Sequence, residues 1–286
     1  MSEKIIISSD STTDLSEELK ERYNISVIPL CITLGSNVYK DGVDIDADKI
    51  YEHHSRTGEL PKTTAANVGE LEEYFAELTK DGSSVVHFTL SSDMSSTYNN
   101  AVIASESFEN VYVVDTKNLS TGGGLLVLSA CDMAANGLDA KTIAEKSKEL
   151  TPNVEASFVI DSLEYLYKGG RCSALSMLGA NLLKLKPCIE VKNGSMGVGK
   201  KYRGKFDDVL KEYIIERLVN IDDIDKTRVF ITHAGCDENL VKDLAKLVSD
   251  KNIFDEVLIT RAGCTVSSHC GRNTLGILFI RKSPIA

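Results

Sequence analysis

Hydroxyl side chains gather in three loops of this sequence, where they could bind an anion. Two of the groups follow predicted strands, and the third follows Pro61. Their members are Ser8, Ser9, Ser11, Thr12 and Thr13; Thr63 and Thr64; and Ser91, Ser92, Ser95, Ser96 and Thr97. Neutral hydroxyls beyond the carboxyl ends of strands, near helix N-termini, suit a carboxylate. Ordinary helix capping accounts for one or two hydroxyls per loop, so both interpretations stay open.

One histidine stands among small polar residues in a segment predicted to be a loop. His269 lies within TVSSHCGRNTLG, just before the last predicted strand. With Ser95 as nucleophile and His269 as base, the chain could be an acyl- or phosphoryl-transfer enzyme. Such catalysis normally needs a third, orienting residue, which is not evident, and the sequence has no G-x-S-x-G motif. We therefore predict no catalytic residue and keep the enzyme as the alternative.

Three further patterns indicate structure more than chemistry. The string GSMGVGKK at 194–201 has the spacing of a phosphate-binding loop, but it lies in a predicted hairpin. Gly122–Gly124 precedes an apolar helix and suits either close approach to a ligand or a tight turn into that helix. Asp10, Asp115 and Asp161 each end a predicted strand, but their spacing specifies no metal site.

Composition and charge exclude several classes of protein. The chain has 286 residues, 42% of them hydrophobic and 26% charged, as in ordinary globular proteins. A net charge of −10 and the absence of tryptophan argue against nucleic-acid binding. The seven cysteines are scattered without a C-x-x-C pair, which fits reduced thiols. Without a signal peptide or a long apolar run, we expect a soluble cytoplasmic protein.

The order of predicted elements divides the chain near Pro152. In residues 1–152 short apolar strands alternate with helices, which predicts an α/β domain with a largely parallel sheet. Residues 153–286 are predicted to form an α+β domain with a hairpin that turns at Asn193-Gly194. Besides this hairpin, the predicted strands are 5–8, 26–34, 84–90, 110–116, 157–162, 228–234, 255–263 and 275–282. The first predicted helix follows a loop within residues 10–23, and the others cover about 47–56, 68–80, 95–107, 121–136, 175–185, 206–219 and 237–249.

The sequence resembles the DegV family in several segments that follow the family's order. These segments are DSTTDL at 10–15, LPKTTAANVGE at 60–70, SSDMSSTYNNA at 91–101, VVDTKNLSTGGGLLVL at 113–128, LEYLYKGGR at 163–171 and LKLKPCIEVKNG at 183–194. The likeness spans about residues 5–284 and implies the family's fold, an α/β N-terminal domain and an α+β C-terminal domain. It further implies a lipid-binding carrier that holds a long-chain fatty acid, such as palmitate, in a tunnel between the two domains.

The resemblance also implies a place in bacterial lipid metabolism. Some members of the family are the fatty-acid-binding subunit of a fatty-acid kinase and present the carboxylate to a separate ATP-binding subunit. For this chain we accordingly expect a kinase subunit as partner, no cofactor beyond the bound fatty acid, and no nucleic-acid partner. We also expect a monomer that makes at most transient contact with a membrane.

The resemblance assigns a head-group site by position. The carboxylate-binding hydroxyls are Thr63, in the P-x-T segment, and Ser95, in the SSxxS segment, and the site is completed by Thr64, Ser96 and His269. This chain departs from the family pattern at several positions near the site. The departures are Thr64 for Ser, Ser96 for Gly, Ala65-Ala66 for Gln-Pro, Ser267-Ser268 for Gly-Thr and Arg272-Asn273 for Pro-Gly.

Two further sets of residues receive roles away from the head group. Arg171, in a fully matching G-G-R, and Arg203, in a basic segment, are predicted to face the partner or a phosphate, or else to be solvated surface charges. Leucines recur at helical spacing on one stripe of a predicted helix over 173–185. They line the implied tunnel or pack in the core, and they are Leu175, Leu178, Leu182 and Leu185.

Overall fold

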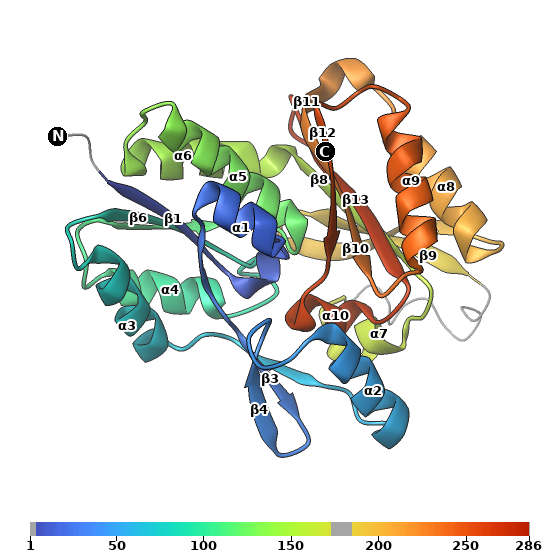
Figure 1. Cartoon of the computed structure of the whole chain (residues 1–286), viewed down its shortest axis with the longest axis horizontal. Coiled ribbons are helices and arrows are strands. Elements are labelled where there is room, and N and C mark those ends of the chain that lie inside the picture. Colours follow the sequence, from blue (N-terminus) through green and yellow to red (C-terminus); the bar gives the residue numbers. More distant parts are fainter. Residues whose placement is uncertain (1–3, 173–184, 286) are drawn as a thin grey trace.

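The first buried run of the sequence lies inside a four-stranded parallel sheet. The computed structural model describes residues 4–172 and 185–285, and Figure 1 shows their arrangement. The strand order is β2-β1-β6-β7, and all neighbours are parallel, as the alternation of strands and helices predicts. The strands are β1 (Ile5–Asp10), β2 (Ser26–Ile28), β6 (Ser84–Thr89) and β7 (Val111–Asp115).

Helices cover both faces of this sheet. α3 and α4 pack on one face, whereas α5 and α6 pack on the other (Figure 1). Side-chain caps define where the helices begin: Asn67 and Glu70 form a reciprocal capping box at α3, and Asp139 caps α6. The helices are α1 (Glu17–Tyr23), α3 (Val68–Thr79), α4 (Thr97–Ser105), α5 (Thr121–Ala135) and α6 (Ala140–Leu150), with a 3-10 turn η1 (Ser11–Thr13) before α1.

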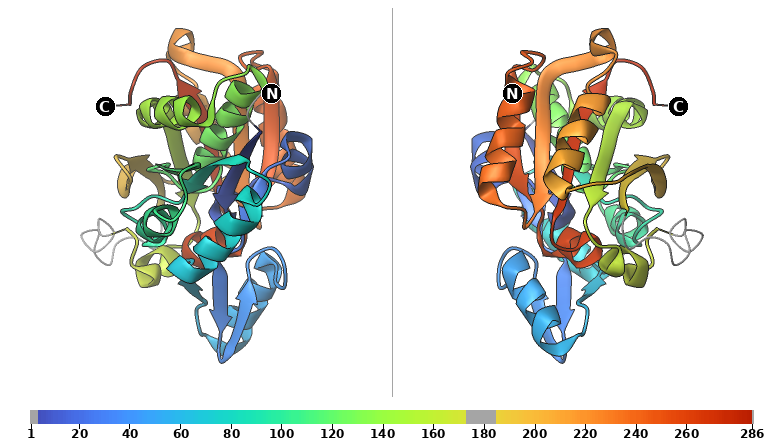
Figure 2. Two further views of the ribbon diagram at one scale, coloured as in Figure 1. Left: turned by 90° about the vertical axis from the view of Figure 1, so that its left-hand side faces the viewer. Right: turned by 90° about the vertical axis from the view of Figure 1, so that its right-hand side faces the viewer.

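The predicted single strand over 26–34 is wrong, because the chain leaves the parallel sheet within it. β2 ends at Ile28, and Pro29 has no N–H to continue the ladder. The chain then forms a separate antiparallel sheet in the order β4-β3-β5. This small unit projects from one end of the molecule in both views of Figure 2. Its elements are β3 (Cys31–Leu34), β4 (Asn37–Lys40), α2 (Ala47–Thr57) and β5 (Lys62–Thr64).

The second half of the chain forms a six-stranded mixed sheet in the order β10-β9-β8-β13-β11-β12. β11 and β12 are parallel and the other neighbours antiparallel. The predicted hairpin is confirmed, because Asn193 and Gly194 both have positive φ (49° and 86°) between β9 and β10. The strands are β8 (Val154–Ile160), β9 (Lys186–Lys192), β10 (Ser195–Tyr202), β11 (Ile224–Ala234), β12 (Glu256–Arg261) and β13 (Thr274–Arg281). The helices are α7 (Glu164–Gly169), α8 (Phe206–Arg217), α9 (Glu238–Ser249) and α10 (Cys264–Cys270), with 3-10 turns η2 (Thr151–Asn153) and η5 (Ile221–Asp223).

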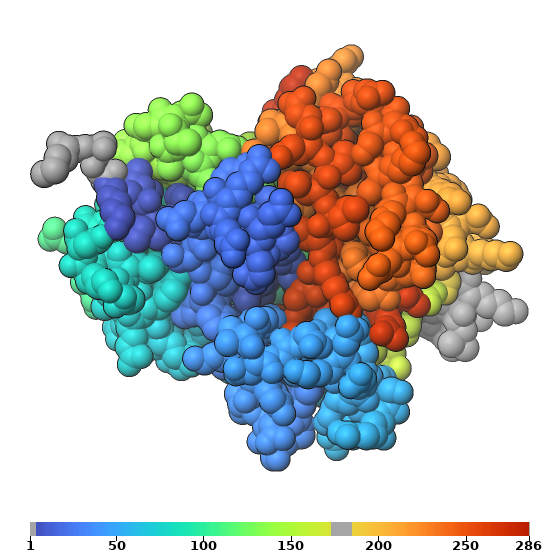
Figure 3. Space-filling model, in the orientation of Figure 1, coloured from blue at the N-terminus to red at the C-terminus, as the bar shows by residue number. Residues whose placement is uncertain are grey.

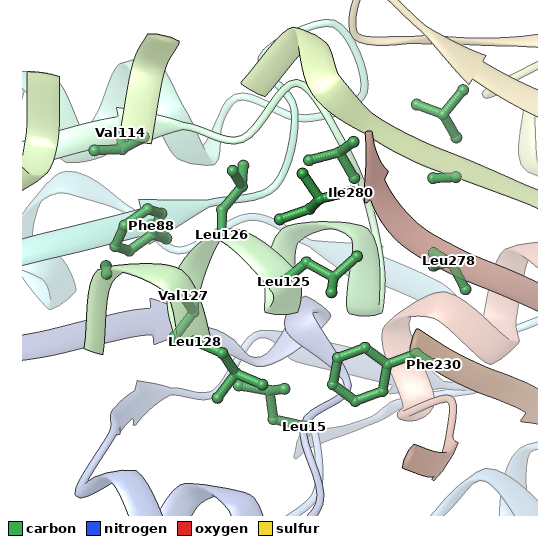
Figure 4. Packing of buried hydrophobic residues seen from close by; sticks show 14 of the residues in the cluster. Leu15, Phe88, Val114, Leu125, Leu126, Val127, Leu128, Phe230, Leu278 and Ile280 are labelled. Carbon is green, nitrogen blue, oxygen red and sulfur yellow. The ribbon is translucent and has the colours of Figure 1, made fainter. Parts of the chain in front are cut away.

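One hydrophobic core joins the two large sheets through α5. Leu125 and Leu128 of this helix are fully buried, and Phe88 from β6 belongs to the same cluster as Phe230 from β11 and Leu278 from β13 (Figure 4). The glycines at the start of α5 serve this packing, since a Cβ at Gly124 would lie 2.9 Å from Leu15 Cδ2. The predicted boundary at residue 152 falls in η2, between α6 and β8, and stays a prediction.

The small unit lies beside the junction of the two halves. In the space-filling view it touches both, with its light-blue atoms against the dark-blue and the red parts of the chain (Figure 3). Tyr51 of α2 and Tyr165 of α7 pack edge to face with ring centroids 6.2 Å apart. No helix among the described residues is long and apolar enough to cross a membrane.

Candidate functional site

A cavity of ≈ 380 Å³ opens where β5, the loop before α4, and α10 come together. Its volume lies in the range of small-molecule sites in proteins. Among the described lining residues the one charged side chain is Arg171, and hydroxyl groups make up most of the other polar surface. The polar lining is Thr12, Thr63, Thr64, Ser95, Ser96, Asn100, Arg171, Thr265 and His269. The remaining lining is Leu30, Ala65, Leu90, Met94, Leu119, Phe158, Leu166, Met196, Val266 and Cys270.

Thr63 and His269 meet at this cavity although 206 residues separate them in the sequence. Thr63 Oγ1 lies 3.0 Å from His269 Nε2, within hydrogen-bond distance. β5 places Thr63 there by pairing it with Ile32 of β3, whose side chain is fully buried in the small unit. Burial, with the nearby Arg171 charge, lowers the pKa of His269 to about 4. The imidazole is therefore neutral at pH 7.

A neutral imidazole can set the direction of the Thr63 hydroxyl. His269 Nδ1 is buried without a hydrogen-bond partner among the described residues. An unpaired buried acceptor costs less than an unpaired buried donor, which favours the tautomer with the proton on Nε2. The Nε2–H then donates to Thr63 Oγ1, and the Thr63 hydroxyl is free to donate to a ligand in the cavity.

Ser95 reaches the same cavity from the loop between β6 and α4. The backbone N–H of Ser95 donates to Ser91 O (3.1 Å), and Ser91 is anchored in turn because its hydroxyl donates to Gly194 O at the tip of the β9–β10 hairpin (2.7 Å). Ser95 Oγ lies 2.9 Å from Thr97 Oγ1 and accepts from the Thr97 N–H (3.2 Å). This hydroxyl is thus held at the cavity wall by the N-terminus of α4.

The geometry does not support the enzyme alternative. A nucleophile and its base lie within hydrogen-bond reach of each other, but Ser95 pairs with Thr97 and His269 pairs with Thr63. The lowered pKa of His269 also makes it a weak base at neutral pH.

His269 lies in a helix, so the predicted loop around it is wrong. α10 begins after Gly263 and ends before Gly271, whose φ is +73°. The hydroxyls of Ser267 and Ser268 donate to carbonyls of Ala262 (3.1 Å) and Cys264 (2.7 Å). Such residues are weak helix formers, and the first turn of α10 is held instead by the side chains of Asp14 and Asp41.

A glycine leaves the room that His269 occupies. A Cβ at Gly169, at the end of α7, would lie 2.5 Å from His269 Nδ1. Arg171 NH1 donates to Gly169 O (2.8 Å), which keeps the arginine beside the histidine. Gly169 therefore leaves space for the His269 ring, and Arg171 lines the cavity beside it.

A smaller apolar chamber of ≈ 30 Å³ adjoins the cavity, between the loop before α5 and the strands β8, β11 and β13. Both spaces are bordered by Leu119, Phe158, Val266 and Cys270. Ala156, Ala234 and Ala262 line the far part, so small side chains leave the space open. The whole cavity is therefore amphipathic, with hydroxyls at one end and hydrocarbon at the other.

The structure distributes the other predicted residues differently. Thr64 and Ser96 line the cavity with exposed side chains, and of the first hydroxyl cluster only Thr12 reaches it, donating to Asp10 (2.5 Å). Ser8 instead lies 2.8 Å from His87 Nδ1 in the core, so this cluster is mainly structural.

Residues outside the described lining are Ala66, Ser267, Ser268, Arg203, Arg272 and Asn273. The predicted helix over 173–185 and its leucine stripe lie outside the described residues, except for Leu185.

Several lining residues had no signal in the sequence. Met94, Phe158, Leu166 and Met196 come from separate elements and carry no shared spacing. Asn100 could have been found, because it stands one helical turn after Ser96 in α4. Its Nδ2 donates to Ala66 O (2.8 Å) and so ties α4 to the loop after β5.

Comparisons with known proteins find the same family by sequence model and by individual relatives. The model of an uncharacterised protein family, the DegV family, matches residues 4–282. A DegV domain-containing protein of Caldanaerobacter subterraneus subsp. tengcongensis is 34% identical over 283 residues, which cover 98% of this chain and 100% of the relative.

Solved structures of similar proteins carry descriptions that mention fatty acids. The chain is similar to a DegV family protein from Thermus thermophilus described by its fatty-acid binding, with a TM-score of 0.90, 26% identity and coverage of 97% of this chain and 99% of the other. It is also similar to a stearic-acid-binding protein from Eubacterium ventriosum, with a TM-score of 0.82, 28% identity and coverage of 99% of both chains.

Proposed function

Because this chain belongs to the DegV family, we propose that it binds a long-chain fatty acid in the cavity between its two halves. The observation that carries the proposal is the amphipathic lining, with neutral hydroxyls at one end and an apolar chamber at the other. A fatty acid has the same division, and the structural relatives are described as binding such molecules.

The proposed head-group partners are Thr63 and Ser95, with His269 behind Thr63. Each hydroxyl can donate one hydrogen bond to a carboxylate oxygen, and Arg171 adds the single positive charge of the described lining. Thr64 and Ser96 lie at the exposed side and contribute less, since water competes there. This division of roles makes the carboxylate an orienting group.

The apolar lining of the main cavity would take most of the tail, with the tail's end in the smaller chamber, and this burial would supply most of the affinity. Each methylene that leaves water contributes about 0.8 kcal/mol, so a C16 tail contributes on the order of 10 kcal/mol. Binding by burial alone needs no cofactor, and the cavity then acts as a carrier site in which no bond of the ligand breaks.

The first test is the protein's own bound lipid. We expect protein purified from its producing cells, or from a bacterial host, to carry one fatty acid of about 250–300 Da, seen by native mass spectrometry as a mass difference and identified after extraction. Delipidated protein should take up fatty acid again at a ratio of one to one. Protein that neither carries a fatty acid nor binds one after delipidation would rule out the proposed function.

We further propose that the bound carboxylate is presented to a separate ATP-binding kinase subunit. Arg171 stands at the cavity, whereas Arg203 is exposed just after β10 and outside the described lining. Because it is exposed outside the cavity, Arg203 is the better candidate for contact with the partner or a phosphate. A guanidinium group can donate two parallel hydrogen bonds to two phosphate oxygens.

The two arginines are expected to behave differently on substitution. Arg203→Ala should keep fatty-acid affinity within about twofold and lower acyl-phosphate formation about tenfold in a reconstituted kinase assay, the size of one lost hydrogen bond to a charged group. Arg171→Ala should weaken fatty-acid binding as well, because it removes a charge from the lining. Normal phosphorylation by the Arg203 variant would assign this side chain to the solvated surface.

A further inference from the structure

Two buried aspartate side chains from the first half of the chain hold the N-terminus of α10, which belongs to the second half, and burial raises the pKa of one of them, Asp14, to about 8. Asp14 follows η1 and Asp41 follows β4, and their residues are only 6% and 5% exposed. Both approach the same backbone position, since a Cβ at Gly263 would lie 3.1 Å from Asp14 Oδ1 and 3.2 Å from Asp41 Oδ1.

Between them the two side chains accept from three consecutive backbone N–H groups. Gly263 N donates to Asp14 Oδ1 (2.8 Å), and Cys264 N donates to Asp41 Oδ1 (2.7 Å). The N–H of Thr265 donates to Asp41 Oδ2 (3.0 Å), and its hydroxyl donates to the same oxygen (2.6 Å). The N–H groups at the start of α10, which have no partner within the helix, thus donate to residues that are distant in the sequence.

Asp41 carries most of this attachment. It receives three of the four bonds from α10 and a further one from Ser11 Oγ (3.1 Å). Neither Asp41 nor Asp14 makes an ion pair with Lys or Arg within the part of the chain that the structure describes. The buried Asp41 carboxylate is therefore stabilised by the helix terminus and hydroxyls.

The same short helix brings its other end to the head-group site. His269 follows Gly263 by six residues, about 9 Å along a helix axis at ~1.5 Å per residue. With α10 anchored at its first turn, His269 Nε2 arrives 3.0 Å from Thr63 Oγ1. Thr63 lies in β5 of the small sheet, and Asp41 directly follows β4 of the same sheet, so α10 makes both contacts with one structural unit.

We propose that Asp41 is a positioning residue of the head-group site, which holds α10 so that His269 meets Thr63. It touches no ligand, because it is outside the described lining of the cavity. Its effect on binding passes through the helix, and the binding part of the test rests on the proposed function.

Asp41→Asn tests the proposal, because it keeps the size of the side chain and removes one of its acceptor oxygens. In ligand-free protein we expect the ¹⁵N resonances of the His269 ring to shift and its pKa to rise from about 4 toward the ordinary value of about 6.5, as the ring leaves its buried place. Asp139→Asn is the matched control, since Asp139 accepts from the N–H and the hydroxyl of Thr142 (2.9 and 2.7 Å) at α6, away from the cavity.

Binding supplies a second readout. Asp41→Asn should lower fatty-acid affinity about 10-fold, the size of a lost bond to a charged group. In the Thr63→Val background it should add much less, because the contact it positions is already gone. Fully additive losses, or an unchanged His269 signal in folded Asp41→Asn protein, would overturn the proposal.

A milder variant covers the case in which Asp41→Asn does not fold. Ser11→Ala removes one donor to Asp41 and leaves the carboxylate in place, so it should shift the His269 signal in the same direction by a smaller amount. No shift in this variant would then overturn the proposal. A wild-type protein that binds no fatty acid would refute the proposed function instead, while the His269 signal still decides the role of Asp41.

Discussion

Replacing Thr63 with valine should lower affinity for a long-chain fatty acid by about 10- to 100-fold, and Ser95→Ala should do the same. Each change removes one donor to a largely buried carboxylate, and a hydrogen bond to a charged group contributes about 1.5–3 kcal/mol. Thr63→Val keeps the shape of the side chain, and it also removes the hydroxyl that pairs with His269 Nε2. Titration calorimetry with delipidated protein measures the loss.

The chemistry of the head group makes this prediction specific. The same variants should bind the fatty alcohol of equal chain length with nearly wild-type affinity, since the charge that the hydroxyls stabilise is absent there. Thr33→Val on β3 and Ser105→Ala at the end of α4 are matched controls outside the described lining. Equal losses for acid and alcohol, or no loss for either, would contradict the assignment of these hydroxyls to the carboxylate.

Much of the fold can be predicted from local patterns in the sequence. Apolar runs of strand length alternate with capped amphipathic helices, so α3 and α9 lie within a residue or so of their predicted bounds. The hairpin at Asn193-Gly194 was equally clear, because few residues adopt positive φ in succession. These features depend on neighbours in the sequence, which is why sequence alone can predict them.

The errors occur where distant residues decide the local structure. β2 ends just before Pro29, and the chain then enters a second sheet. The proline predicts that a strand ends there, but it does not predict which strands β3 will pair with. α10 is rich in Ser, Thr and Cys and would not be helical alone. Its first turn is completed by Asp14 and Asp41, more than 220 residues earlier in the chain.

The candidate site shows the same division. Thr63, Ser95 and His269 were predicted together from a resemblance, and the structure brings all three to one cavity, while their roles stay predictions. The first hydroxyl cluster looked similar in sequence but mainly serves the core. A hydroxyl beside a strand end can face either the ligand or the protein, and only packing decides which.

Val266→Phe should change the chain-length preference of the site more strongly than any head-group change. Val266 lies on α10, half-buried, and borders both the main cavity and the apolar chamber. A phenyl group there would close the passage between them. If about four methylenes lose their place at ~0.8 kcal/mol each, affinity for C16 and C18 acids falls on the order of 100-fold.

The direction of the change distinguishes a blocked passage from a damaged fold. Acids of about ten carbons reach only the main cavity, so the variant should bind them about as well as wild type does, and its preference should reverse toward short chains. Val257→Phe on β12 is the matched control, because this half-buried valine lies outside the described lining of both cavities. Competition among acids of increasing length against one labelled probe measures the preference. A parallel loss at all lengths, or an unchanged preference, would show that the tail does not pass Val266, because only a chain that crosses this point is sensitive to what blocks it.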